Sequence, residues 1–218
     1  MDKKIFEKAF SERRMEKYFK RYPDTDKAIM HYQCNIELSE AFYPCINVFE
    51  ILLRNSISRE LIKSFGREDW FAQFASTPGL ADLNKYVIQA NKQIVGRKEY
   101  SSSQIITELS LGFWVSLFNV EYERILWKDL RKVFPNMPKK ERQRKKVASP
   151  LNRFRTFRNR IFHHEPISWN IERIKRIHTE ILTVITWMNV DIATWFATFD
   201  RFDNVCKCIE KKLYDITL

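Results

Sequence analysis

The residues best suited to chemistry lie in one short segment, residues 150–166, which reads PLNRFRTFRNRIFHHEP. Two of the protein's four histidines, His163 and His164, are adjacent here and follow Arg158 and Asn159. Histidine titrates near neutral pH, so its ring can accept or donate a proton. Arginine holds a permanent charge on a planar fork that matches phosphate oxygens. Together these side chains could bind a phosphate group and transfer a proton beside it.

A helix must position these side chains, and we expect it to begin at Ser149-Pro150 and end near His164, before Glu165-Pro166. At about 100° per residue, one face of this helix is apolar and is expected to point to the core; it holds Leu151, Phe154, Phe157, Ile161 and Phe162. Asn152, Asn159 and His163 share a polar stripe, and Asn159 lies one turn before His163. His164 is expected to point away from this stripe, with Arg153, Thr156 and Arg160.

Each of these residues also has a purely structural interpretation. Arg158 falls within the apolar arc, about 140° from His163, and could form a buried ion pair with a core carboxylate. His163 could simply stabilise the C-terminal end of a helix dipole. For His164 a supporting role is favoured. Glu50 and Arg54 are spaced for an intrahelical salt bridge, although Arg54 could also brace the motif helix.

The net charge of +11 is concentrated next to this motif. Residues 131–160 contain twelve Lys and Arg and one acid, Glu141, whereas the rest of the chain holds 26 bases and 26 acids. Such a field suits a polyanion, although KKERQRKK (139–146) alone could be a solvated linker. The residues predicted to bind this polyanion, for which nucleic acid is favoured, are Lys139, Lys140, Arg142, Arg144, Lys145, Lys146, Arg153 and Arg155.

The rest of the chain predicts an all-α protein, a single helical domain of about eight to ten helices over residues 1–218. Only four glycines are present, and apolar residues recur at helical spacing. N-terminal helices are expected over 1–66, ending at Gly66, with a break or a kink at Pro44. A helix from Ala81 is expected to stop at Gly96. Gly112 is expected to allow close helix packing.

Composition excludes several classes of protein. No apolar run is long enough to span a bilayer, and the N-terminal MDKKIFEKAF is charged where a signal peptide is apolar. Cys206 and Cys208 lack the spacing of a zinc knuckle, so we expect reduced thiols, no metal and no cofactor. These features favour a soluble protein of the cytoplasm that does not contact membranes.

The segment RNRIFHHEPI (158–167) resembles the signature of the Abi-like (abortive infection) proteins of the HEPN superfamily. Four further stretches resemble the same family in the same order: residues 35–57, 106–118, 122–135 and 151–167. The resemblance implies a HEPN-like helical bundle with additional N-terminal helices and a motif-bearing helix at about 150–164. It also implies a metal-independent endoribonuclease, formed when two protomers juxtapose Arg158, Asn159 and His163, with His164 in support.

Three functions remain open from the sequence. The first is a homodimeric ribonuclease toxin or phage-defence effector. It would cleave RNA by attack of the RNA 2′-hydroxyl on the adjacent phosphate. The second is a non-catalytic RNA-binding protein held with a structured non-coding RNA or an antitoxin protein. The third is a DNA-binding regulator, which no helix-turn-helix spacing or zinc finger supports.

Overall fold

The computed structural model describes residues 2–94 and 101–216, and in these ranges it contains α-helices and short 3-10 helices but no strand. The all-α prediction is confirmed. Eleven α-helices lie in the described ranges, against the eight to ten expected, and the first two, α1 (Lys3–Phe10) and α2 (Glu12–Arg21), are separated only by Ser11. The expected stop at Gly96 lies outside the described residues.

A single long helix, α3 (Thr25–Phe65), is the axis of the fold. Asp24 caps its first turn by accepting from the N–H groups of Asp26 and Lys27, and Gly66 ends it in the left-handed conformation, with φ of 70°. Forty-one residues correspond to about 60 Å of helix. Pro44 lies inside α3, which continues through it, so of the two outcomes expected there the chain does not start a new helix.

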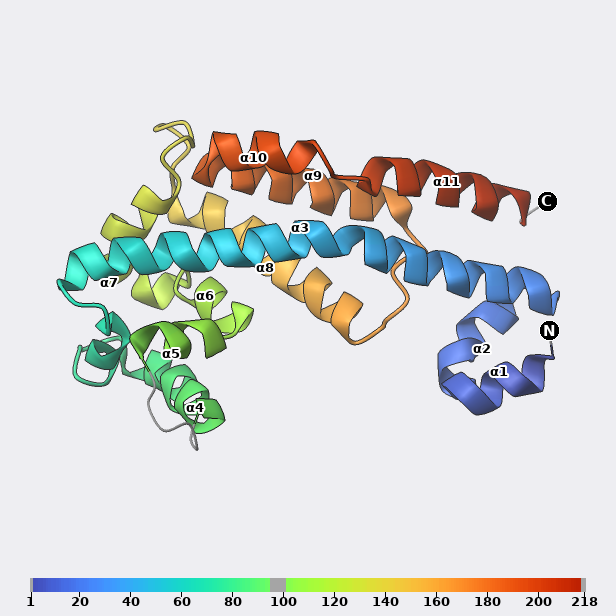
Figure 1. Cartoon of the computed structure of the whole chain (residues 1–218), viewed down its shortest axis with the longest axis horizontal. Helices are drawn as coiled ribbons and strands as arrows, with labels where there is room; N and C mark the ends of the chain where they lie inside the picture. The colour runs from blue at the N-terminus through green and yellow to red at the C-terminus, as the bar shows by residue number, and fades with distance from the viewer. Residues whose placement is uncertain (1, 95–100, 217–218) are drawn as a thin grey trace.

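The other helices gather at the two ends and along one side of α3 (Figure 1). The α1–α2 pair packs at its N-terminal end. At its C-terminal end lie α4 (Asn84–Ile94), α5 (Ser102–Glu108), α6 (Leu111–Ser116) and α7 (Glu123–Leu130). Along its length run α9 (Ile171–Met188), α10 (Val190–Ala197) and α11 (Phe202–Asp215). One continuous core runs along α3, including Leu38, Phe42, Phe49, Leu53 and Ile57.

The motif helix, α8 (Arg144–Phe162), crosses α3 obliquely, and its C-terminal end projects between the α1–α2 pair and the α4–α6 group (Figure 1). It begins at Arg144, earlier than the start expected at Ser149-Pro150. Pro150 lies inside the helix, where it cannot donate to the carbonyl of Lys146, an exposed residue of the first turn. Part of the basic run, which is the name used here for residues 139–146, therefore forms the first turn of the motif helix.

Candidate functional site

Aromatic packing fixes α8 on α3. Phe154 meets Phe49 edge to face with ring centroids 4.5 Å apart, and Phe157 meets Phe42 at 4.9 Å. The expected apolar face is buried at Leu151, Phe154, Phe157 and Ile161. Phe162 was expected on this face but is 44% exposed, because the helix ends there, beyond the edge of the core.

The two histidines follow the last helical residue and lie on a tight turn. His163 is the C-terminal cap, and its N–H donates to the carbonyl of Asn159 over 2.9 Å. His164 has a positive φ of 54°, a conformation that costs a non-glycine residue free energy. The expected direction of His164, based on a regular helix, is therefore wrong: the turn brings it to the same pocket as His163.

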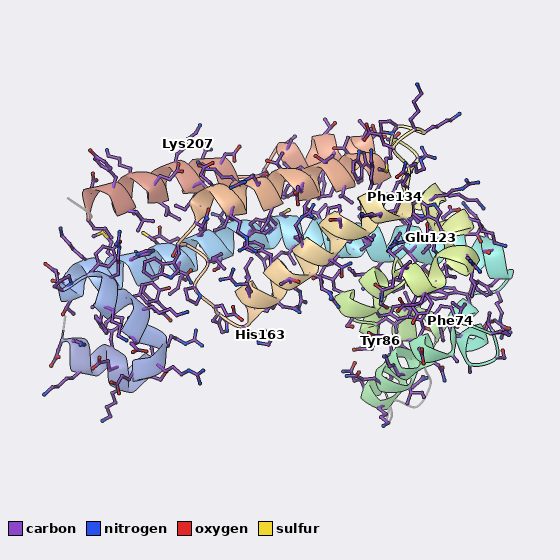
Figure 2. All side chains as sticks on the ribbon, turned by 180° about the vertical axis from the view of Figure 1, so that it is seen from behind. Phe74, Tyr86, Glu123, Phe134, His163 and Lys207 are labelled. Carbon is purple, nitrogen blue, oxygen red and sulfur yellow. The ribbon has the colours of Figure 1, made fainter. Side chains whose placement is uncertain are left out.

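This histidine pocket, of about 390 Å³, lies between the end of α8 and helix α2. Its lining residues are Ser11, Arg13, Arg14, Glu16, Lys17, His163, His164, Glu165 and Pro166. Both imidazoles are exposed, and three cations of α2 face them. The guanidinium of Arg14 donates to the backbone carbonyl of His164 over 2.6 Å, which fixes the turn to α2. Figure 2 shows His163 at this projecting end of α8.

A buried polar cluster anchors the chain just after the histidines. The Oδ1 atom of Asn35 accepts from the backbone N–H groups of Ile167 and Ser168, at 2.6 and 3.1 Å. His31 lies between the hydroxyls of Tyr22 and Ser168, at 3.1 and 3.0 Å. Burial, and to a lesser extent the charge of Arg21, lowers the pKa of His31 to about 4. A neutral His31 thus ties helix α3 to the segment that positions the histidine pocket.

Arg158 and Asn159 line a different cavity, the arginine pocket, of about 410 Å³. It lies between α8, α3 and the α5–α6 connection, and Arg54 and Arg155 also line it. Arg158 donates from Nε to Oε1 of Glu50 over 2.8 Å, and its guanidinium stacks on the Phe162 ring, 4.0 Å from the centroid. The side chains of Arg158 and Glu50 are 27% and 28% exposed, so this pair is half-buried.

The expected pair of Glu50 with Arg54 does not form, because Glu50 reaches Arg158 instead and Arg54 donates to Asn55 over 3.3 Å. Asn47, one turn before Glu50, is exposed. Gly112 lies at the wall of the arginine pocket, where an added Cβ would lie 3.4 Å from the hydroxyl of Ser110, the N-cap of its own helix. Among the described residues no atom of another helix lies within 4 Å of that position, so the close helix packing expected at Gly112 is not found.

Within one chain, the motif is therefore divided between two pockets on different sides of the end of α8. Arg158 and Asn159 face the α5–α6 side, and His163 and His164 face α2. Arg158 and His163 therefore line separate pockets in the described chain.

The residues of the basic run differ in whether their side chains are bound within the protein or exposed to a ligand. Arg142 donates to the backbone carbonyls of Pro135 and Met137, at 2.6 and 2.8 Å. Arg144 pairs with Glu123 over 2.7 Å and donates to the carbonyl of Phe118, and its side chain is only 15% exposed. These two arginines hold the connection between α7 and α8. Lys139, Lys140, Lys145 and Lys146 are exposed, with Lys146 3.7 Å from Glu141.

The two remaining arginines predicted to bind RNA lie on opposite sides of α8. Arg153 faces α9, where its Nε and Nη2 bind Glu180 at 2.9 and 3.1 Å. Arg155 faces the arginine pocket, and its buried Nε has no hydrogen-bond partner among the described residues. A buried N–H without a partner is costly and suits a site that an anion completes.

Sequence reasoning did not identify Arg13, Arg14 and Lys17 beside the histidines. Their segment, EKAFSERRMEKYFKR, intersperses three acids among six bases, so its excess of positive charge is small beside that of residues 131–160. In the described ranges, no group of three or more His, Cys, Asp or Glu side chains could hold a metal ion, and no helix could cross a membrane.

Comparisons with known protein families, with curated proteins and with solved structures found no match for this chain.

Proposed function

We propose that this protein is a metal-independent endoribonuclease of the abortive-infection or toxin type that acts in the cytoplasm. The observation that carries the proposal is the histidine pocket. It presents two exposed imidazoles on a fixed turn, with Arg13, Arg14 and Lys17 beside them. This set combines proton transfer with binding of a polyanion.

The reaction follows from these groups. One imidazole removes the proton of an RNA 2′-hydroxyl, and the 2′-oxygen attacks the adjacent phosphorus. The bond from phosphorus to the 5′-oxygen breaks, and a protonated imidazole gives that oxygen a proton. Guanidinium groups stabilise the charge that develops on the phosphate oxygens. The products carry a 2′,3′-cyclic phosphate and a 5′-hydroxyl.

In the proposed enzyme two protomers associate through the projecting ends of α8. A two-fold axis there places the arginine pocket of one chain near the histidine pocket of the other, so that Arg158, Asn159 and His163 act on one phosphate. His164 supports the turn. The proposal matches the division of the motif between two pockets.

One observation favours a second candidate, a non-catalytic RNA-binding protein that acts with a structured RNA or an antitoxin partner. Arg158 is already engaged by Glu50 and Phe162 and does not line the pocket of the histidines. In this case Arg158 is a structural residue, and the cations serve binding alone.

The two candidates are separated by incubating the purified full chain with mixed RNA in the presence of EDTA. Cleavage is expected to continue, with cyclic phosphate and 5′-hydroxyl ends. Cleavage that requires added Mg²⁺, or that persists at the wild-type rate in His163→Gln, contradicts the enzyme proposal. Binding without cleavage supports the second candidate.

A further inference from the structure

A groove of about 550 Å³ lies between α8 and α9, on the side of α8 away from the arginine pocket. It is called the α8–α9 groove below. Its lining residues are Asn152, Arg153, Thr156, Phe157, Arg160, Asn170, Arg173, Arg176, Ile177 and Glu180. Four arginines from two helices thus converge on one concave surface.

The charge of this groove is not fully balanced by its own acids. Arg153 binds Glu180, and Arg160 binds Glu165 over 3.0 Å. Arg173 and Arg176 are exposed and form no ion pair among the described residues, and Arg176 donates only to a backbone carbonyl of its own helix, that of Glu172. Two guanidinium groups are therefore available to a ligand. A concave basic surface concentrates positive potential, so the ligand must be an anion.

The floor of the groove indicates which part of a nucleic acid it takes. Phe157 and Ile177 lie there and are only 4% and 6% exposed. Aromatic rings that bind bases must expose a face for stacking, which Phe157 does not. The groove is therefore suited to phosphates and not to bases, and contact with phosphates carries no sequence information.

The groove adjoins the histidine pocket. Arg160 lines the groove and donates to Glu165 and to the carbonyl of Pro166, and these two residues line the histidine pocket. The two sites are therefore separated by directly bonded residues at the end of α8. The basic run at the start of α8 lies at the opposite end of that helix.

We propose that the α8–α9 groove binds the phosphate backbone of single-stranded RNA through Arg173 and Arg176 and leads the strand to the histidine pocket. The inference rests on the RNA-binding part of the proposed function and extends it to helix α9. It assigns RNA contacts to two arginines outside the charged segment of the sequence.

The test measures binding of a fluorescein-labelled single-stranded RNA with methylated 2′-oxygens, which cannot be cut by 2′-hydroxyl attack. Anisotropy titrations of the full chain at several salt concentrations give the affinity and its salt slope. The variant Arg173→Glu/Arg176→Glu is expected to bind about tenfold or more weakly, with a salt slope smaller by about 1.4, as two lost phosphate contacts require.

The matched control is Lys207→Glu/Lys211→Glu, which makes the same change in net charge on exposed residues of α11. Lys207 and His163 lie at opposite edges of the molecule in Figure 2. The control is expected to keep the wild-type slope. Equal losses of affinity in both variants would show an effect of net charge alone and would overturn the proposal, as would an unchanged slope in the groove variant.

Two further arms complete the test. If circular dichroism shows that Arg173→Glu/Arg176→Glu does not fold, Arg173→Gln/Arg176→Gln takes its place and is judged by the same criteria. Unlabelled inorganic phosphate and unlabelled RNA then compete for the labelled strand. Inorganic phosphate at millimolar concentration is compared with unlabelled RNA that contains the same concentration of phosphate groups. If both displace the labelled strand equally well, the groove binds a free anion and the RNA proposal is overturned.

The outcome is independent of catalysis. If no RNA is cleaved by any variant, the endoribonuclease proposal fails, and the anisotropy data still decide on the groove. If the groove variant binds normally while His163→Gln loses cleavage, the groove inference fails and the enzyme proposal stands.

Discussion

Arg158 and Glu50, 108 residues apart in the sequence, are joined by a 2.8 Å hydrogen bond between Nε and Oε1. The bond links the motif helix to the middle of α3, and about a quarter of each side chain remains exposed. An exposed or half-exposed ion pair contributes about 1 kcal/mol or less to stability. The pair therefore serves mainly to position the Arg158 side chain and contributes little to the stability of the fold. The terminal nitrogens of the guanidinium form no hydrogen bond to a carboxylate among the described residues.

Replacement of Arg158 is therefore expected to affect activity more than folding. Arg158→Ala should abolish RNA cleavage and lower the free energy of unfolding by about 1 kcal/mol. Glu50→Gln is the matched control, since it removes the same ion pair and keeps the guanidinium. Urea denaturation and a cleavage assay on both variants check this. Unfolding of Arg158→Ala would identify Arg158 as structural, and cleavage at the wild-type rate by a folded Arg158→Ala would contradict its role in the reaction. Equal loss of activity in two folded variants would show that Glu50 is needed to position the guanidinium.

The two histidines are expected to differ in their effects. His163→Gln should lower the cleavage rate by ~10²–10⁴ with little change in RNA affinity, because proton transfer is lost and the neighbouring cations remain. His164→Asn should have a smaller effect, since asparagine tolerates the positive φ of this position and the Arg14 bond to its carbonyl is kept. Single-turnover kinetics at saturating protein measure both. A larger loss in His164→Asn would reverse the two roles.

The sequence predicted the helical class and the buried face of α8 well, because both depend on local periodicity. It misplaced Phe162, because periodicity does not show where the core ends, and it misplaced His164, because a regular helix was extended beyond the residue where the chain turns. It also missed Arg13, Arg14, Arg173 and Arg176. Acids are interspersed with the bases in both segments, so neither segment stands out by charge along the sequence. In space, however, Glu172 of α9 and Glu210 of α11 both bind Lys175 and leave Arg173 and Arg176 without an ion pair among the described residues. A count along the chain cannot show that separation.

The basic run is expected to divide into binding and structural residues. Charge reversal at Lys139, Lys140 and Lys145 should weaken RNA binding and flatten its salt dependence, since each lost phosphate contact removes about 0.7 from the slope. Arg144→Ala should instead lower the free energy of unfolding by about 1–3 kcal/mol, because it breaks the bonds to Glu123 and Phe118. An unchanged salt slope in the lysine variant would mean that these lysines are a solvated surface.

A homodimer formed through the projecting end of α8 is expected to have about twice the 26.4 kDa mass of one chain in light scattering. The division of the motif between two pockets makes a sharper test possible. Arg158→Ala and His163→Gln should each be inactive alone, and a mixture should regain part of the activity as mixed dimers form. An active monomer, or a mixture as inactive as its parts, would contradict a site shared between protomers.

Finally, the stability of the fold is expected to depend on pH through His31. Burial lowers the pKa of His31 to about 4, whereas an unfolded chain has the ordinary value near 6.5. Between these two values the unfolded chain binds more protons, so the free energy of unfolding must fall as the pH falls below about 6.5 and level off below about 4. The expected loss from pH 7 to pH 5 is about 1–2 kcal/mol.

His31→Gln, which cannot titrate, should be less stable at pH 7 and should lose less stability over this range. Urea denaturation of both proteins at the two pH values gives the comparison. Equal losses would show that His31 does not cause the acid sensitivity, and a gain of stability at pH 5 would mean that its pKa is raised in the folded chain.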